Sequence, residues 1–320
     1  MQSRNVNYTT RCAPSKFFDF MNEVKLKDEH IKAIADTPFK EFMRFPRLPV
    51  QRTFLNSILD RWDNASSCFI LGGKRVFIKP QDIVVILGLS MRGEYIDLKK
   101  KLDDCDKQLK DKYFPNVLLS RNLMEENIKK LLEQSLEESL TDFTKLFILY
   151  IFNTILFPNA SQTTPKFLLH YVNNLEKMHS YAWATAVYEF LVRSISEGAK
   201  KKKGYVNGCV MILEPWLREH IILQPGLTTK MVYPRLLRWV GNNYQQAGTH
   251  KKYINSLIHT QVTEDITLTN EEKILLPPDK SNMVEEIRRY LEPVLLRIEE
   301  KIDTMLVLPT QLQKLRSEEK

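Results

Sequence analysis

Histidine and cysteine most often supply nucleophiles and metal ligands, and this chain of 320 residues holds few of them. They are scattered, at His30, His170, His179, His220, His250 and His259 and at Cys12, Cys68, Cys105 and Cys209. No HExxH or CxxC spacing occurs, and structural metal sites and redox pairs normally show such close pairs. We therefore expect no metal site, and we interpret the thiols as mostly buried groups of a reduced intracellular protein.

Catalytic pairs and cofactor loops give no stronger signal. A thiolate beside an imidazole would suit a cysteine protease, but the spacing of Cys209 and His220 does not place them together, and Cys209 precedes an apolar run. Gly72-Gly73-Lys74 lacks the GxxxxGK[ST] frame of a phosphate-binding loop. No lysine stands in the Gly- and Ser-rich setting of a pyridoxal phosphate site. We expect no enzyme, no catalytic residue and no cofactor.

Basic residues provide the remaining candidates, because the formal net charge is +8. The run Lys200, Lys201, Lys202 and Lys203 could contact phosphates or direct nuclear import, although a solvated loop is the simpler interpretation. Arg218, Arg235 and Arg238 lie near Trp216 and Trp239, a combination that suits stacking on nucleic acid. The tryptophans also have core spacing, which favours packing. These seven basic residues are our candidate polyanion contacts.

The clearest local pattern lies in residues 67–93. Two short β-prone stretches flank Gly72-Gly73, and a Gly-Gly pair supplies the positive φ angles of a tight hairpin. Pro80 suits the first position of a helix, Asp82 its first turn, and Gly88 its end. We predict a hairpin followed directly by a buried helix.

Helical periodicity dominates elsewhere, so we predict a mainly α fold, a multi-helix globular domain with one small β-hairpin near residues 68–78. Residues 142–157 form the strongest buried helix, and their apolar run is too short to cross a membrane. Trp62, Trp183 and Trp216 should be buried with Leu87 and Leu149. The expected divisions are a disordered N-terminus at 1–15, a helical domain at 16–240, a polar linker at 241–280, and a C-terminal helix with a charged tail at 281–320.

Several segments together resemble the plant mobile domain, the MAIN-like family that also carries the label aminotransferase-like. The matching segments, in order, are Leu59-Asp60-Arg61-Trp62, the hairpin from Phe69 to Phe77, Pro80-Gln81-Asp82-Ile83 with Leu87-Gly88-Leu89 and Gly93, Leu149-Tyr150 with Leu156-Phe157-Pro158, Tyr181-Ala182-Trp183-Ala184, and Gly208-Cys209 with Leu213 and Trp216. The chain departs from the family at Ala184, where Gly is usual, and at Pro215. A related plant domain of unknown function, found upstream of Ulp-type cysteine proteases in transposon proteins, shares the Leu71-Gly72-Gly73 turn and is the second family considered.

The resemblance implies a non-enzymatic nuclear interaction domain. Its members are associated with meristem maintenance, genome stability and transposon silencing, and with a phosphatase-like partner. No catalytic residue carries over, and the residues here do not support the aminotransferase label. A transposon-derived nucleic-acid-binding protein is the alternative, and a transferase ranks third. The expected location is the nucleus, with a protein partner, nucleic acid as an alternative ligand, and no membrane.

Overall fold

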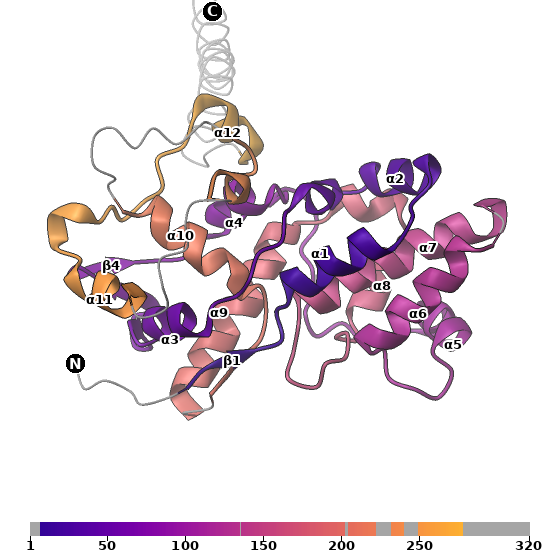
Figure 1. The fold of residues 1–320 in the computed structure, drawn as a ribbon, viewed down its shortest axis with the longest axis horizontal. Coiled ribbons are helices and arrows are strands. Elements are labelled where there is room, and N and C mark those ends of the chain that lie inside the picture. The colour runs from indigo at the N-terminus through magenta and orange to yellow at the C-terminus, as the bar shows by residue number, and fades with distance from the viewer. Residues whose placement is uncertain (1–6, 135, 202–203, 222–231, 240–248, 278–320) are drawn as a thin grey trace, which may run out of the picture. The chain divides into compact units, whose positions relative to one another are not determined.

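The computed structural model describes residues 7–134, 136–201, 204–221, 232–239 and 249–277. The chain divides into two compact units, Met1–Leu276 and Pro277–Lys320, and every described residue except Pro277 lies in the first. Helices dominate this unit and strands are few and short (Figure 1). The predicted mainly α fold with a small β-hairpin is therefore confirmed.

Helices of different lengths make up most of the described chain. The α-helices are α1 (Pro14–Glu23), α2 (Asp28–Ala35), α3 (Arg52–Leu59), α4 (Pro80–Leu87), α5 (Asp104–Tyr113), α6 (Arg121–Leu132), α7 (Leu136–Ile151), α8 (Leu168–Val172), α9 (Trp183–Lys201), α10 (Leu213–Glu219), α11 (Thr249–Ser256) and α12 (Asn270–Leu275). Short 3-10 turns are η1 (Lys40–Arg44), η3 (Glu176–Ser180), η4 (Val210–Ile212), η5 (Arg235–Trp239) and η6 (His259–Gln261), and η2 (Phe152–Leu156) is a π-helical turn. The strands are β1 (Thr9–Thr10), β2 (Trp62–Asp63), β3 (Cys68–Leu71), β4 (Lys74–Val76) and β5 (Tyr205–Val206).

The predicted hairpin is the β3–β4 pair, extended by β2 into a three-stranded antiparallel sheet. Gly72 and Gly73 form its turn with φ angles of +54° and +85°. A Cβ on Gly72 would lie 2.7 Å from the carbonyl carbon and oxygen of Ile258. The glycine is therefore needed twice, for the turn and for the close approach of a segment far along the chain.

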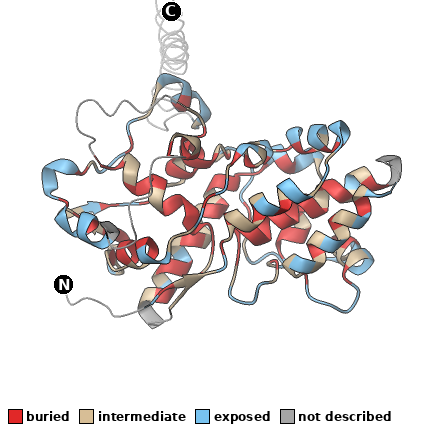
Figure 2. Cartoon of the chain, viewed as in Figure 1, coloured by how far each residue is buried: buried red, intermediate tan, exposed pale blue. Residues whose placement is uncertain are grey.

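Helix α7 forms the centre of the core and runs on into η2. It packs against α2, α6 and α8, and Figure 2 shows it largely buried. Within the described ranges, Ser139–Leu156 is long and apolar enough to cross a membrane by length and composition alone. Because 78% of that stretch is buried inside the protein, we interpret it as a core helix.

The tryptophan prediction is confirmed. Trp62 is 2% exposed, and Trp183 and Trp216 are completely buried, as are Leu87 and Leu149. All five belong to one hydrophobic cluster. Each large aromatic side chain removes much apolar surface from water, so these residues contribute strongly to the stability of the helical packing.

Both ends of the described chain depart from the sequence-based divisions. Residues 7–15, expected to be disordered, form β1 and begin α1, because β1 pairs with β5 and Tyr8 is buried. Part of the expected linker, residues 249–276, folds onto the domain, with α11 against α3. Ile254, Leu257, Val262 and Ile266 of this segment are buried. The expected C-terminal helix at 281–320 lies outside the described residues.

Candidate functional site

The first turn of α4 carries a buried carboxylate that joins two distant parts of the chain. Asp82 accepts a hydrogen bond from the backbone N–H of Lys79 at 2.8 Å, which caps the helix. It also accepts one from Trp216 Nε1 at 3.0 Å. Burial raises the pKa of Asp82 to about 6, because it disfavours the charged form more than these donors favour it. The Pro80-Gln81-Asp82 motif thus fixes α4 and α10 together.

His220 lies next to this carboxylate network, directly after α10. Its ring centroid is 4.7 Å from that of Trp216, and Nδ1–H donates to the Thr263 carbonyl at 2.9 Å. Burial lowers the pKa of His220 to about 4. Among the described residues His220 Nε2 has no hydrogen-bond partner, so the protease-like pairing with Cys209 does not form. His220 therefore contributes packing and a backbone hydrogen bond.

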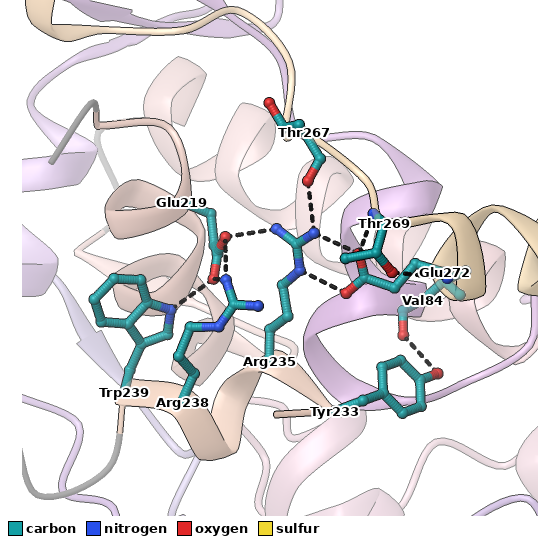
Figure 3. Close-up of polar contacts among 9 residues, drawn as sticks. All are labelled: Val84, Glu219, Tyr233, Arg235, Arg238, Trp239, Thr267, Thr269 and Glu272. Atoms are coloured by element: carbon teal, nitrogen blue, oxygen red, sulfur yellow. Dashed lines mark hydrogen bonds and ion pairs between the residues drawn. The ribbon is translucent and has the colours of Figure 1, made fainter. Parts of the chain in front are cut away.

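Arg235 occupies the centre of the arginine cluster, which we define as Glu219, Arg235, Arg238, Trp239 and Glu272 (Figure 3). Only 3% of Arg235 is exposed. Its Nε donates to Glu272 Oε1 at 2.7 Å and its Nη1 to Glu219 Oε2 at 2.6 Å. Although burial opposes ionisation, the hydrogen bond from Arg235 keeps the pKa of Glu272 below its ordinary value. The guanidinium is fully engaged inside the protein.

Glu219 receives donors from three side chains of the cluster. Arg238 Nη1 lies 3.0 Å from Glu219 Oε1, and Trp239 Nε1 donates to the same oxygen at 2.9 Å. With Arg235 the carboxylate is bonded on both oxygens. Two arginines thus face two glutamates, so the charges of the cluster balance. A buried charge left without its partner is costly, which makes this cluster a strong determinant of the local structure.

The outcomes for the candidate basic residues follow from these contacts. Arg218 pairs with Glu214 at 2.9 Å and lies 5.5 Å from the ring centroid of Trp239. All three candidate arginines therefore have carboxylate partners within the chain. The predicted loop at Lys200–Lys203 is partly helical, because α9 continues to Lys201, and Lys202 and Lys203 lie outside the described residues.

A hollow of about 620 Å³ adjoins the cluster, within the range of ligand sites. It is lined by Val232, Tyr233, Arg238, Thr269, Glu271, Glu272 and Leu275. The charged groups of Arg238 and Glu272 are turned to Glu219 and Arg235. Next to the hollow, α12 exposes Ile274 and Leu275, at 72% and 38%. The lining of the hollow therefore combines apolar side chains, such as Val232 and Leu275, with the charges of Arg238 and Glu272, which are paired inside the chain.

Metal binding has no support in the described part of the chain, where no group of three or more His, Cys, Asp or Glu side chains could hold an ion.

Glu219 and Glu272 were not identified from the sequence. Glu272 had a usable signal, because Thr269 and Glu272 form a capping box: Thr269 Oγ1 accepts from Glu272 N–H at 3.2 Å, and Glu272 accepts from Thr269 N–H at 2.9 Å.

Comparison with family models identifies residues 10–214 as a domain of unknown function, DUF8566. The chain belongs to this family. The DUF8566 match includes the hairpin, α4, Trp62 and Trp183, and it ends before Trp216, Glu219, Arg235 and Glu272. The arginine cluster thus lies outside the part that the DUF8566 model describes.

Relatives of this DUF8566 chain include three Arabidopsis thaliana proteins. It is 21% identical to Protein MAIN-LIKE 2 over 69% of its length, 21% identical to Protein MAINTENANCE OF MERISTEMS over 70%, and 20% identical to Protein MAIN-LIKE 1 over 74%. These similarities confirm the resemblance to the MAIN-like plant mobile domain family. The matches span 35%, 48% and 49% of the relatives, so the chain covers between a third and a half of their length. No solved structure matches it.

Proposed function

We propose that this chain is a non-enzymatic interaction domain of the plant mobile domain type that works in the nucleus through protein partners. The observation that carries the proposal is its similarity to the MAIN and MAIN-like proteins over about 70% of its length. One of these relatives is named for the maintenance of meristems, and we extend that role to this chain. Related roles in genome stability and transposon silencing belong to the same proposal.

The main polar side chains bond within the fold while apolar side chains are exposed, and this supports an interaction role. Asp82, Arg235 and Arg238 have their hydrogen-bonding groups directed at other residues of the chain. Next to them, Leu275 lines the hollow, and the neighbouring Ile274 on α12 exposes apolar surface. Apolar side chains beside a concavity are typical of contacts with another protein. We therefore assign the partner-binding surface to α12 and the hollow.

A serine/threonine phosphatase-like protein is the partner that we propose. The chain is 22% identical over 181 residues to the Arabidopsis thaliana protein named Serine/threonine-protein phosphatase 7 long form homolog. That match covers 54% of this chain and only 14% of the phosphatase homolog, so most of the homolog lies outside the similar segment. The phosphatase homolog thus contains a segment similar to this chain. We infer that this chain and a separate phosphatase-like protein also associate.

The direct test measures binding of the purified full chain to the purified phosphatase 7 long form homolog. Ile274→Asp places a charge on the proposed surface, and Ile31→Asp is the matched control, because Ile31 is also exposed but lies on α2. We expect affinity to fall about tenfold or more with Ile274→Asp, as for an interface hot spot, and to stay unchanged with Ile31→Asp. Equal effects of the two variants, or no binding by the wild type, would contradict the assignment.

Nuclear location needs its own measurement. A fluorescent fusion of the full chain in Arabidopsis root meristem cells should accumulate in the nucleus. Cytoplasmic signal alone would count against the proposed location.

Nucleic-acid binding by a transposon-derived protein is the alternative, and the run of four lysines at positions 200–203 favours it. Phosphate contacts make affinity fall steeply with salt. A fluorescence titration with double-stranded DNA at rising potassium chloride separates the two functions. Tight binding with a steep salt slope that is lost with Lys200–Lys203 replaced by alanine would support the alternative over the protein partner.

A further inference from the structure

Two of the three charged side chains that line the hollow beside α12 are paired inside the chain (Figure 3). Arg238 Nη1 donates to Glu219 Oε1 at 3.0 Å. Glu272 Oε1 accepts from Arg235 Nε at 2.7 Å. The third charged side chain is that of Glu271, which is exposed and forms no ion pair with any residue that the structure describes. The lining of the hollow therefore carries one negative charge that the described part of the fold does not pair.

This unpaired carboxylate lies on the same face of α12 as an apolar part of the lining. Leu275 follows Glu271 by four residues, about one helical turn, and both side chains line the hollow. Lys273 is two residues from Glu271, so it points to another side of the helix, and it is not part of the lining. Arg92 donates to the Ile274 carbonyl at 2.7 Å, at the other end of α12. Neither of these two cations forms an ion pair with Glu271.

The lining has the chemistry that a basic side chain requires. Hydrogen bonds from its own backbone N–H and from the Thr269 hydroxyl lower the pKa of Glu271, so the carboxylate is charged at neutral pH. The Tyr233 hydroxyl is bonded to the Val84 carbonyl at 3.3 Å, and the residue lines the hollow together with Leu275 (Figure 3). Lys and Arg side chains lay their aliphatic stems along such apolar surface while the charged group meets a carboxylate or an aromatic ring.

We propose that the hollow binds a Lys or Arg side chain of the partner protein, with its charge at Glu271 and a neighbouring apolar side chain against Leu275. This inference rests on the proposed function, because it names the partner chemistry at the surface assigned there. The two residues are separated by about 6 Å along the helix axis. Side chains two residues apart in an extended segment are about 6.6 Å apart and lie on the same side. An extended partner segment with a basic and an apolar side chain at that spacing therefore fits.

Fluorescence polarisation with two labelled peptides tests this chemistry without the natural partner. The probe is Gly-Leu-Ser-Arg-Ser-Leu-Gly, and the comparison peptide has Glu in place of Arg. Because the chain has a net charge of +8, the Glu peptide is also attracted to other parts of its surface. The measured quantity is therefore the ratio of the two affinities, compared between the purified full-length wild type and its variants at low ionic strength.

Substitutions of Glu271 should change this ratio. Glu271→Gln should lower the preference for the Arg peptide about fivefold, as for one partly exposed charge pair, and Glu271→Lys should lower it further. Glu126→Gln is the matched control, because Glu126 is also exposed and unpaired among the described residues but lies on α6, and it should leave the ratio unchanged. High potassium chloride should weaken the effect of Glu271, because salt screens exposed charges.

The inference is overturned if the wild type does not bind the Arg peptide, or if Glu271→Gln and Glu126→Gln change the ratio equally. Binding to the phosphatase 7 long form homolog separates this result from the proposed function. If Ile274→Asp weakens that complex while Glu271→Lys does not, the assigned surface stands and the basic side chain is wrong. If the homolog does not bind at all, the proposed partner is wrong, and the peptide ratio still decides the chemistry of the hollow.

Discussion

Trp216 Nε1 donates a 3.0 Å hydrogen bond to Asp82 Oδ2, joining residues that are 134 positions apart in the chain. The same carboxylate caps α4 through the backbone N–H of Lys79. The Asp82 side chain thus accepts a backbone N–H at the start of α4 and also accepts the N–H of a buried indole. Asp82 lies within the matched family region, residues 10–214, and its partner Trp216 lies just beyond the end of that region.

Replacement of Asp82 should therefore destabilise the domain. Asp82→Ala leaves the Lys79 N–H and the Trp216 indole without an acceptor in a buried place, and we expect a loss of about 3 kcal/mol from the free energy of unfolding. Asp82→Asn keeps one acceptor oxygen and should lose less. Urea unfolding followed by tryptophan fluorescence measures both. Equal losses for the two variants would show that hydrogen bonding to Asp82 is not the cause.

The pH dependence of stability should reveal two opposing groups beside Trp216. The pKa of Asp82 is raised to about 6 in the folded state, so its contribution is full below pH 4 and is lost as pH rises through 6. The pKa of His220 is lowered to about 4, so its contribution is full above pH 6.5 and is lost as pH falls through 4. Each contribution to the free energy of unfolding amounts to about 3 kcal/mol. The two change in opposite directions with pH, so their pH dependences largely cancel in the wild type.

Single variants should separate these two contributions. With His220→Asn the free energy of unfolding should fall more steeply than in the wild type as pH rises from 4 to 6.5. With Asp82→Asn it should rise more steeply over the same range. Other titrating groups are common to all three proteins and drop out of the comparison. Parallel curves for the wild type and both variants would contradict the assignment.

Replacement of Arg235 should be among the single substitutions that lower the free energy of unfolding most. Arg235→Met leaves Glu219 and Glu272 buried without their shared guanidinium, and we expect a loss of about 3–5 kcal/mol. Arg44→Met is the control, because Arg44 pairs with Glu41 on the surface and its side chain is 58% exposed. That pair should contribute less than about 1 kcal/mol. Comparable losses in thermal unfolding for the two variants would contradict the role of the cluster.

The two glycines of the hairpin turn offer a matched pair. Both have positive φ, but a Cβ on Gly73 has nothing within 4 Å, whereas a Cβ on Gly72 meets the Ile258 carbonyl at 2.7 Å. Gly73→Ala should cost about 1–2 kcal/mol from backbone strain alone. Gly72→Ala should cost distinctly more and should expose the 258–262 segment to limited proteolysis. If the two variants unfold at the same denaturant concentration, the close approach does not stabilise the fold.

Sequence patterns identified the hairpin, α4 and the core tryptophans because local chemistry determines them. Gly72-Gly73 favours one turn, Pro80 favours a helix start, and apolar spacing marks the buried face of a helix. Glu272 could have been noticed from its capping box. The pairing of β1 with β5 could not, because two-residue strands carry no periodic signal and because Thr9 and its partner Tyr205 are 196 positions apart.

By itself, the sequence determined a mainly α class, the position of the turn and the tryptophans of the core, since these follow from the backbone preferences and hydrophobicity of neighbouring residues. Only the tertiary structure decided which charges meet. The sequence made Arg235 a candidate contact for polyanions, but folding places it between Glu219 and Glu272. There the electrostatic attraction between the paired charges is stronger than in water. Likewise β1 and β5 become neighbours only in the folded chain, because the spatial proximity of distant residues is a property of the packed chain.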